Sequence, residues 1–388
     1  MKKVLFIGDD HNFRKEYQQL DPESDFKTAR SSDPVKREEE YDILIISDRE
    51  VQPLTLSTFV QDCRAHQIYY LISDNHKNSI IDNKITLCKQ NGIKPIQPKQ
   101  TNTQIVHRIL GISHKANGIR NVCAVMGTHP QVGTTMITLE LAKKLAEQEQ
   151  TVCVMGLNQF NPGTAFVENY VGNTLDELYA QIVDNRQTIK PHELINYMHF
   201  DENRKFHYLA GNQDFSKRGY FKSEDIEHLI GMASEQFDVV LLDVGFSPCN
   251  NLTLQGLFKA EVKLVVGSQQ PHSAKMWNQM NNDILRILGL TTDEFLLVVN
   301  RYKLDLPTDA KALQNTLEVP VITTIPEFGI EGTICEMEKK LLTESRDKTV
   351  KKRAENSMES MLAVVNERLG TKVTRTKEKT GLWNRLLS

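Results

Sequence analysis

The chain has 388 residues, of which 39% are hydrophobic and 25% charged. This composition is typical of a soluble globular protein and excludes a disordered, collagen-like or integral membrane protein. Lysine and arginine together number 47 against 50 aspartates and glutamates, so no basic field favours nucleic acid. The six cysteines form no CxxC pair, and no secretion signal or membrane-spanning stretch is visible. We therefore expect a cytoplasmic protein without structural disulfides or zinc, which contacts a membrane only peripherally.

The first hundred residues alternate short apolar runs with polar stretches of helical length. Continuous apolar runs between turn residues are typical of buried parallel strands. The spacing predicts a small, doubly wound α/β domain over residues 1–112, followed by a linker over 113–119. The four runs that we assign to strands are Val4–Ile7, Ile43–Ile46, Tyr69–Ile72 and Lys94–Ile96.

The same alternation predicts a second α/β domain over residues 120–345. Helical patterns at Thr135–Gln148 and Ser273–Leu288 lie between its strands. This order favours a parallel sheet with helices on both faces. Residues 346–388 are expected to form a charged helical tail. The strands of the second domain are predicted at Val122–Met126, Val152–Met155, Val239–Leu242, Val262–Val266, Phe295–Val299 and Val319–Ile322.

The segment Gly127-Thr128-His129-Pro130-Gln131-Val132-Gly133-Thr134-Thr135 follows a predicted strand and opens a predicted helix. A loop in this setting is typical of phosphate binding, because backbone N–H groups and the helix dipole attract anions. The segment resembles the deviant Walker motif of the ParA/MinD family of P-loop ATPases, whose pattern is Lys-Gly-Gly-x-Gly-Lys-Thr. Gly133 and Thr135 match that pattern. His129 replaces the signature lysine, and Thr134 replaces the lysine that grips the phosphates.

Three later segments also resemble the ParA/MinD family. The first is the acidic strand that ends in Asp243, and the second is the strand that ends in Asn300, which would face the adenine. The third contains Pro326 in a base-side loop. The resemblance implies ATP and Mg²⁺ as cofactors, with Thr135 and Asp243 on the metal. The nucleotide-binding residues that it implies are Gly127, Gly133, Thr134, Thr135, Asp243, Asn300 and Pro326.

The replacements predict weak nucleotide binding and little or no hydrolysis. Pro130 offers no N–H to a phosphate, and Thr134 offers no cation. The loss of a charge-assisted contact weakens binding roughly ten- to a hundredfold. Gly156 and Asn158 stand where the family has an Asp-x-Asp pattern beside the attacking water. A pseudo-ATPase is therefore our first interpretation. The alternatives are a functional ATP-dependent dimerisation switch of the ParA/MinD type and a DNA-partitioning protein, which the acidic net charge disfavours.

Residues 1–112 resemble a response-regulator receiver domain. Asp9-Asp10 matches the acidic pair after the first strand, and Ser73 matches the hydroxyl of the fourth. Ser47 occupies the position of the phospho-accepting aspartate, with Asp48 one residue later, and Gln97 replaces the lysine of the fifth strand. We favour a pseudo-receiver that serves docking. The alternative is a Mg²⁺ site formed by the two acidic residues of the pair and Asp48.

The end of the sequence combines basic and apolar residues. Lys372, Arg375, Lys377 and Lys379 precede a short segment, Gly381–Ser388. If this segment is helical, one face gathers its apolar side chains, as in interfacial membrane anchors. The segment also resembles the C-terminal membrane-targeting helix of MinD-like proteins. A frayed terminus and a helix docked on a protein surface remain alternatives. The apolar residues are Leu382, Trp383, Leu386 and Leu387.

A pseudo-receiver followed by a MinD-like domain is the architecture of the TadZ/CpaE family, which this chain resembles over nearly its whole length. The resemblance implies an assembly or localisation factor of a Flp (tight adherence, type IVc) pilus or a related secretion system. It also implies a homodimer that acts with pilus or secretion proteins at the inner face of the cell membrane or at a pole. No nucleic-acid partner is expected.

Overall fold

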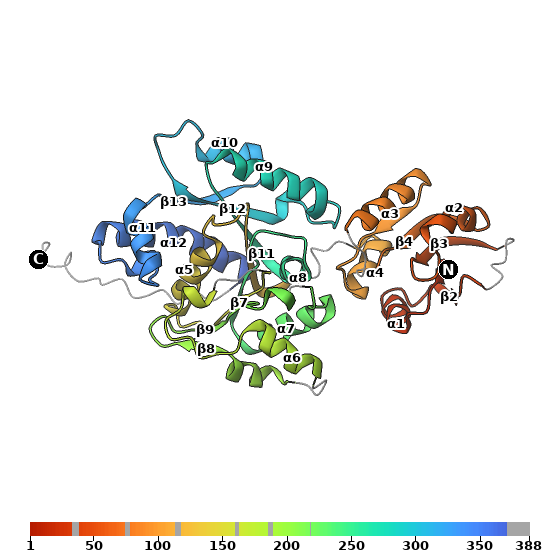
Figure 1. Ribbon diagram of the computed structural model, residues 1–388, viewed down its shortest axis with the longest axis horizontal. Coiled ribbons are helices and arrows are strands. Elements are labelled where there is room, and N and C mark those ends of the chain that lie inside the picture. The colour runs from red at the N-terminus through yellow and green to blue at the C-terminus, as the bar shows by residue number, and fades with distance from the viewer. Residues whose placement is uncertain are drawn as a thin grey trace, which may run out of the picture. The chain divides into compact units, whose positions relative to one another are not determined.

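The computed structural model describes residues 1–32, 39–73, 78–112, 118–159, 163–184, 189–217 and 219–370. Most of the expected linker and the whole of the expected anchor, including Leu382, Trp383, Leu386 and Leu387, lie outside these residues. The chain divides into two compact units, Met1–Ala116 and Asn117–Ser388 (Figure 1). None of the helices in the described ranges is both long and apolar enough to cross a membrane.

The first unit is built on a parallel sheet in the order β2-β1-β3-β4-β5, which is a doubly wound order. α1 and α4 pack on one face of the sheet, and α2 and α3 pack on the other. β2 was not predicted, because Phe26 is its only buried residue. The strands are β1 (Lys3–Ile7), β2 (Asp25–Ala29), β3 (Glu40–Ser47), β4 (Arg64–Leu71) and β5 (Lys94–Ile96), and the helices are α1 (His11–Leu20), α2 (Pro53–Gln61), α3 (Asn78–Gln90) and α4 (Asn102–Leu110).

The second unit contains an eight-stranded sheet in the order β13-β12-β11-β6-β10-β7-β9-β8. All neighbouring strands are parallel except β8 and β9, which form an antiparallel edge. The predicted α/β class with parallel sheets is therefore confirmed. The strands are β6 (Ile119–Gly127), β7 (Val152–Gly156), β8 (His199–Asp201), β9 (Phe206–Leu209), β10 (Val239–Asp243), β11 (Ala260–Gly267), β12 (Phe295–Tyr302) and β13 (Val321–Pro326).

Helices cover both faces of this sheet, and each face has its own apolar core. One core receives side chains from α6 to α10, and the other receives side chains from α5, α11 and α12. Figure 1 shows α5, α11 and α12 in the same part of the unit. The helices are α5 (Thr134–Ala146), α6 (Leu175–Asp184), α7 (Ser223–Gln236), α8 (Asn251–Lys259), α9 (Pro271–Met280), α10 (Ala310–Leu317), α11 (Gly329–Met337) and α12 (Lys348–Leu369).

The described part of the predicted charged helical tail (346–388) is helical, but this helix, α12, is part of the second core. Met358, Met361 and Val365 of this helix are buried in the cluster that also contains α5. The side-chain amide of Asn366 donates to Gln148 Oε1 at 2.9 Å. The high charge of this stretch belongs to its exposed face, which concealed the apolar stripe that packs on the sheet.

We expect Met361→Ala to lower the free energy of unfolding of the second unit by about 2–5 kcal/mol, because it leaves a cavity in the core. Glu359→Ala, on the exposed face of the same helix, should change it by less than about 0.5 kcal/mol. Urea denaturation followed by Trp277 fluorescence in a Trp383→Phe background measures both. Equal stabilities of the two variants would show that α12 is a detachable tail.

Candidate functional site

The carboxyl ends of the parallel strands of the second unit border a cleft of about 740 Å³. This volume lies within the range of pockets that bind small molecules. The cleft contains every predicted site residue except Gly127 and Gly156, which end β6 and β7 beside it. The predicted residues that line it are His129, Gly133, Thr134, Thr135, Asn158, Asp243, Asn300 and Pro326.

The loop between β6 and α5 depends on two glycines. Gly133 precedes α5 with φ +99°, a left-handed conformation that glycine adopts at little cost. A Cβ atom at Gly133 would lie 2.4 Å from Nδ2 of Asn300. A Cβ atom at Gly127 would lie 2.6 Å from the Thr134 hydroxyl oxygen and 2.8 Å from a methyl group of Val132. Both positions therefore require glycine for the loop to close over the end of β6.

Asn300 holds this loop from the end of β12. Its Nδ2 donates to the carbonyl oxygen of Val132 at 2.8 Å, and the residue is 9% exposed. The resemblance implied an asparagine that faces an adenine. In this structure an amide N–H of Asn300 is engaged with the loop, and the absence of a side chain at Gly133 allows this close approach. The contact with an adenine stays a prediction.

Thr135 and Asp243, the two predicted magnesium ligands, lie together in the cleft. The Thr135 hydroxyl donates to Oδ2 of Asp243 at 2.6 Å. Asp243 is 1% exposed, and burial raises the pKa of its carboxyl, although bonds from Thr135 and from the Gly245 N–H oppose this. A hydroxyl and a carboxylate are hard oxygen ligands, so the pair fits Mg²⁺ either directly or through water.

The His129 side chain is buried and is bonded to other residues of the protein. Its Nδ1–H donates to the Pro130 carbonyl oxygen at 2.8 Å, and its Nε2 lies 3.2 Å from the Ser268 hydroxyl, which therefore acts as the donor. The ring also packs edge-on against His272. Burial lowers the pKa of His129, and the charges of His272 and Arg301 lower it further against the bond to Pro130. At neutral pH the ring is uncharged and does not replace the signature lysine as a cation.

The end of β7 supplies no carboxylate to the cleft. Gly156 pairs with Asp243 across β7 and β10. Asn158 is 7% exposed and packs against Gly245, whose φ is +67°. The only carboxylate-bearing residues among the described cleft-lining residues are Asp243, Glu327 and Glu336. The last two belong to the β13 and α11 side, away from β7 in the order of the strands.

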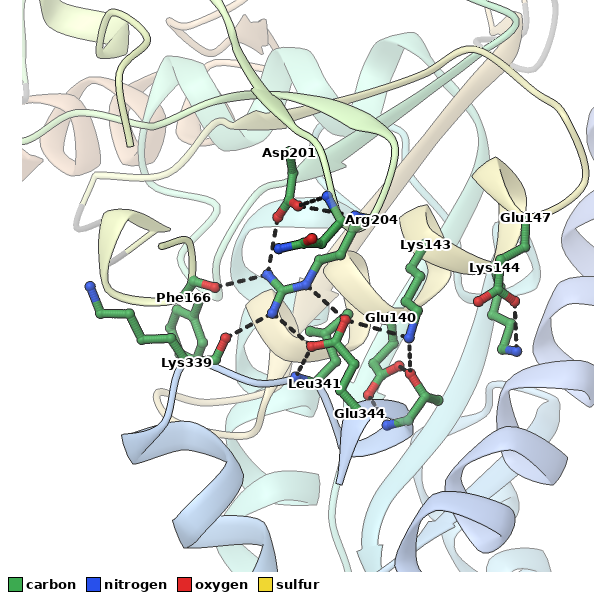
Figure 2. Close-up of polar contacts among 12 residues, drawn as sticks. Glu140, Lys143, Lys144, Glu147, Phe166, Asp201, Arg204, Lys339, Leu341 and Glu344 are labelled. Carbon is green, nitrogen blue, oxygen red and sulfur yellow. Dashed lines mark hydrogen bonds and ion pairs between the residues drawn. The ribbon is translucent and has the colours of Figure 1, made fainter. Parts of the chain in front are cut away.

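A buried ionic network supports two walls of the cleft (Figure 2). Arg204, in the turn between β8 and β9, is 5% exposed. Its Nε and Nη2 donate to the two carboxylate oxygens of Glu344 at 3.0 and 2.9 Å. Nη1 donates to the Phe166 carbonyl oxygen at 3.1 Å and to Asp201 at 3.4 Å, and Nη2 reaches the Lys339 carbonyl oxygen at 2.7 Å. Arg204 therefore holds in place the two segments that contain Phe166 and Leu342, which are apolar residues of the cleft walls.

The same network continues to α5. Glu140 is fully buried and accepts bonds from the N–H and the hydroxyl of Thr343 at 3.0 and 2.8 Å. Lys143 Nζ contacts the Thr343 hydroxyl at 3.2 Å and Glu344 at 3.4 Å. Burial raises the pKa of Glu140, and the bonds from Thr343 oppose the rise. The helix that follows the loop is therefore tied to the segment before α12. No motif in the sequence indicates this network.

The first unit contains the predicted carboxylate cluster of Asp9, Asp10 and Asp48, but each of these carboxylates has a different partner. Asp9 pairs with Arg30 at 3.0 Å, and Asp10 caps α1 by accepting from the Phe13 N–H at 2.9 Å. The described residues contain no group of three or more His, Cys, Asp or Glu side chains that could hold a metal. The alternative of a Mg²⁺ site at Asp9, Asp10 and Asp48 is therefore not supported.

Asp48 is part of a buried ion pair. It is 3% exposed and accepts from Lys84 Nζ at 2.7 Å and from the N–H of Ser73 at 2.9 Å, as well as from the Ser73 hydroxyl. Burial alone would raise the pKa of this carboxyl, but the bonds from Lys84 and Ser73 outweigh it and lower the pKa. The positive charge beside Asp48 is Lys84 of α3, and not a residue near Gln97, where receiver domains have their lysine. The sequence gives one signal for Lys84 that was missed: it is three residues after Ile81 and four before Cys88, so all three share the buried face of α3.

No protein-family model matches the chain, and no curated protein matches it. Its fold is similar to solved structures of ParA and MinD ATPases. One is a ParA family ATPase from Chlorobium tepidum TLS, with a TM-score of 0.54 and 13% sequence identity over 63% of this chain and 98% of that one. Another is the septum site-determining protein MinD from Pyrococcus horikoshii OT3, complexed with Mg-ADP, with a TM-score of 0.50 and 16% identity over 64% and 98%. This likeness establishes the fold and not the activity.

For the first unit we expect Asp48→Ala to lower the stability by about 3–5 kcal/mol, because it leaves the Lys84 charge buried without its partner. Since the pKa of Asp48 is lowered on folding, its contribution is present at neutral pH and is lost as the pH falls below about 4. Hydrogen exchange of the β1 and β3 amides measures the loss, with the exposed Asp82→Ala as control. A phosphoryl adduct formed by acetyl phosphate and absent from Asp48→Ala would contradict the structural role.

For the second unit we expect Arg204→Met to lower the stability by about 1–3 kcal/mol, because Glu344 loses its bidentate bond to the guanidinium and keeps the longer ion pair with Lys143. The matched control is Lys205→Met, at an exposed neighbour, with an expected change of less than about 0.5 kcal/mol. The double variant Arg204→Met/Glu344→Gln should recover part of the loss. Urea denaturation followed by Trp277 fluorescence is the measurement. A loss below 1 kcal/mol in the single variant would mean that the network does not support the cleft.

Proposed function

We propose that the chain is an assembly or localisation factor of a Flp (tight adherence, type IVc) pilus or a related secretion system, as its resemblance to the TadZ/CpaE family implies. In this role the second unit binds ATP with Mg²⁺ weakly and hydrolyses it little or not at all. One observation carries the proposal: the cleft retains a nucleotide-binding frame, whereas the groups that drive hydrolysis in the ParA/MinD family are replaced.

The binding frame consists of the loop, the start of α5 and the metal side. The left-handed Gly133 presents the first N–H groups of α5, which attract a phosphate through their unpaired donors and the helix dipole. Thr135 and Asp243 would hold Mg²⁺, which neutralises phosphate charge when bound. MinD from Pyrococcus horikoshii, whose fold is similar, was solved with Mg-ADP. The cleft is also large enough for a nucleotide.

The replaced groups argue against rapid hydrolysis. Phosphoryl transfer depends on a positioned water and on positive charge at the phosphates. Gly156 has no side chain, and the Asn158 amide cannot accept a proton as a carboxylate does. His129 is uncharged and is held by Pro130 and Ser268. Nucleotide bound here would serve as a structural ligand, for instance at a homodimer contact.

The remaining parts of the chain would provide the contacts of a localisation factor. The first unit keeps a doubly wound fold around the buried Asp48–Lys84 pair, which suits a docking domain without phosphorylation. Leu382, Trp383, Leu386 and Leu387 would attach the protein to the membrane, and a homodimer would strengthen this attachment because it carries two such segments. Pilus or secretion proteins are the proposed partners.

The decisive measurement is steady-state phosphate release with ATP and Mg²⁺. We expect the full chain to release phosphate no faster than the double variant Thr135→Ala/Asp243→Ala, which lacks the metal side of the cleft. The second candidate, an ATP-dependent dimerisation switch, is favoured by the intact Thr135–Asp243 pair. Turnover well above that of the double variant, with dimerisation that depends on ATP, would establish this switch and overturn the pseudo-ATPase.

A further inference from the structure

Arg301 is the only lysine or arginine among the described residues that line the cleft. Three carboxylate residues, Asp243, Glu327 and Glu336, line the same cleft. Without Arg301, the charge of this lining would therefore oppose the binding of a polyanion. The Arg301 side chain is exposed and makes no ion pair with the described part of the chain, so its guanidinium is available to a ligand.

The backbone at Arg301 is unusual. Its φ of +53° is in the left-handed region, which residues other than glycine rarely occupy and which is often found at functional sites. The preceding residue, Asn300, is bonded to the Val132 carbonyl oxygen in the loop. The left-handed turn at Arg301 therefore occurs where β12 is attached to the phosphate-binding loop.

The electrostatics place the Arg301 charge near this loop. The charge of Arg301 contributes to the lowered pKa of His129, which belongs to the loop. Arg301 borders the same cleft as Gly133 and Thr134. Because the neighbouring Asn300 lies against Gly133, Arg301 is close to the first N–H groups of α5, where a phosphate would bind.

The geometry points to Arg301 as the residue that supplies the cationic phosphate contact which Thr134 cannot make. The ligand class is a nucleoside polyphosphate, whose oxygens accept bidentate bonds from a guanidinium. This inference rests on the proposed nucleotide binding of the cleft. It explains how the cleft binds phosphate without the lysine of the loop, while Gly156 and Asn158 still leave it without the groups for hydrolysis.

The test is a comparison of ligand series in the full-length protein. Fluorescent ATP, inorganic tripolyphosphate and adenosine are titrated with Mg²⁺ against wild type, Arg301→Gln and Arg301→Lys. The matched control is Lys303→Gln, because Lys303 is an exposed residue two positions further on that does not line the cleft. We expect Arg301→Gln to weaken ATP and tripolyphosphate roughly ten- to a hundredfold. Adenosine should bind all the variants alike, Lys303→Gln should match wild type, and Arg301→Lys should lie between.

Other outcomes overturn the inference. Equal losses for ATP and adenosine would mean that Arg301 contacts the base, and unchanged affinities would mean that it contacts only solvent. Wild type that binds neither ATP nor tripolyphosphate at millimolar concentration would overturn both this inference and the proposed nucleotide binding, and would leave only the localisation role standing. Rapid phosphate release by wild type would overturn the pseudo-ATPase and leave the Arg301 assignment intact. An NMR titration of His129 checks the geometry independently, because its pKa should rise in Arg301→Gln and stay unchanged in Lys303→Gln.

Discussion

The hydrogen bond from Asn300 to the carbonyl oxygen of Val132 joins two segments that are 168 residues apart in sequence. It attaches the end of β12 to the loop between β6 and α5, and it requires glycine at position 133. This contact brings together the loop, the start of α5 and the left-handed residue Arg301. Because this contact depends on a backbone carbonyl, an amide and a glycine, the loop can keep its shape when its charged side chains change.

The side chains that line the cleft, and not the contact between Asn300 and the loop, determine the charge of the cleft. His129 and Thr134 remove two positive groups that the ParA/MinD pattern would supply. His129 uses both ring nitrogens within its own chain, so it stabilises the loop instead of a ligand. Arg301 brings a positive charge back from another strand. Binding and hydrolysis can therefore separate in one fold, because binding needs a cation at the phosphates, whereas hydrolysis also needs a positioned water.

The central strands could be predicted because their buried residues are consecutive in the sequence, and the strand ends placed Asp243 and Asn300 at one edge of the sheet. In the short hairpin of β8 and β9, exposed or half-buried residues interrupt the buried ones, and the edge strand β2 buries only Phe26, so these strands give no such signal. α12 was mistaken for a tail because its exposed lysines and glutamates obscured the apolar stripe. The bond from Asn300 to the loop could not be predicted, because it joins residues that are 168 positions apart.

Lys84 and Arg204 illustrate a second limit of sequence reasoning. Each is a charged residue in a buried position, and each is stabilised by carboxylates from other elements. A sequence shows the charge but not the partner, since the pairs are 36 and 140 residues apart. Composition alone assigns such residues to the surface.

The long span of the Arg204–Glu344 and Glu140–Thr343 contacts has a consequence for protein synthesis. The residues that they join are 140 and 203 positions apart, so the helix after the loop and the turn between β8 and β9 meet their partners only when the ribosome has completed most of the second unit. Until then Glu140 lacks Thr343, and Arg204 lacks the carboxylate of Glu344, so neither can be buried with the partners it has in the complete fold. The last turns before α12 thus act as a closing element, and a ribosome that stalls before residue 343 leaves the cleft without one of its walls.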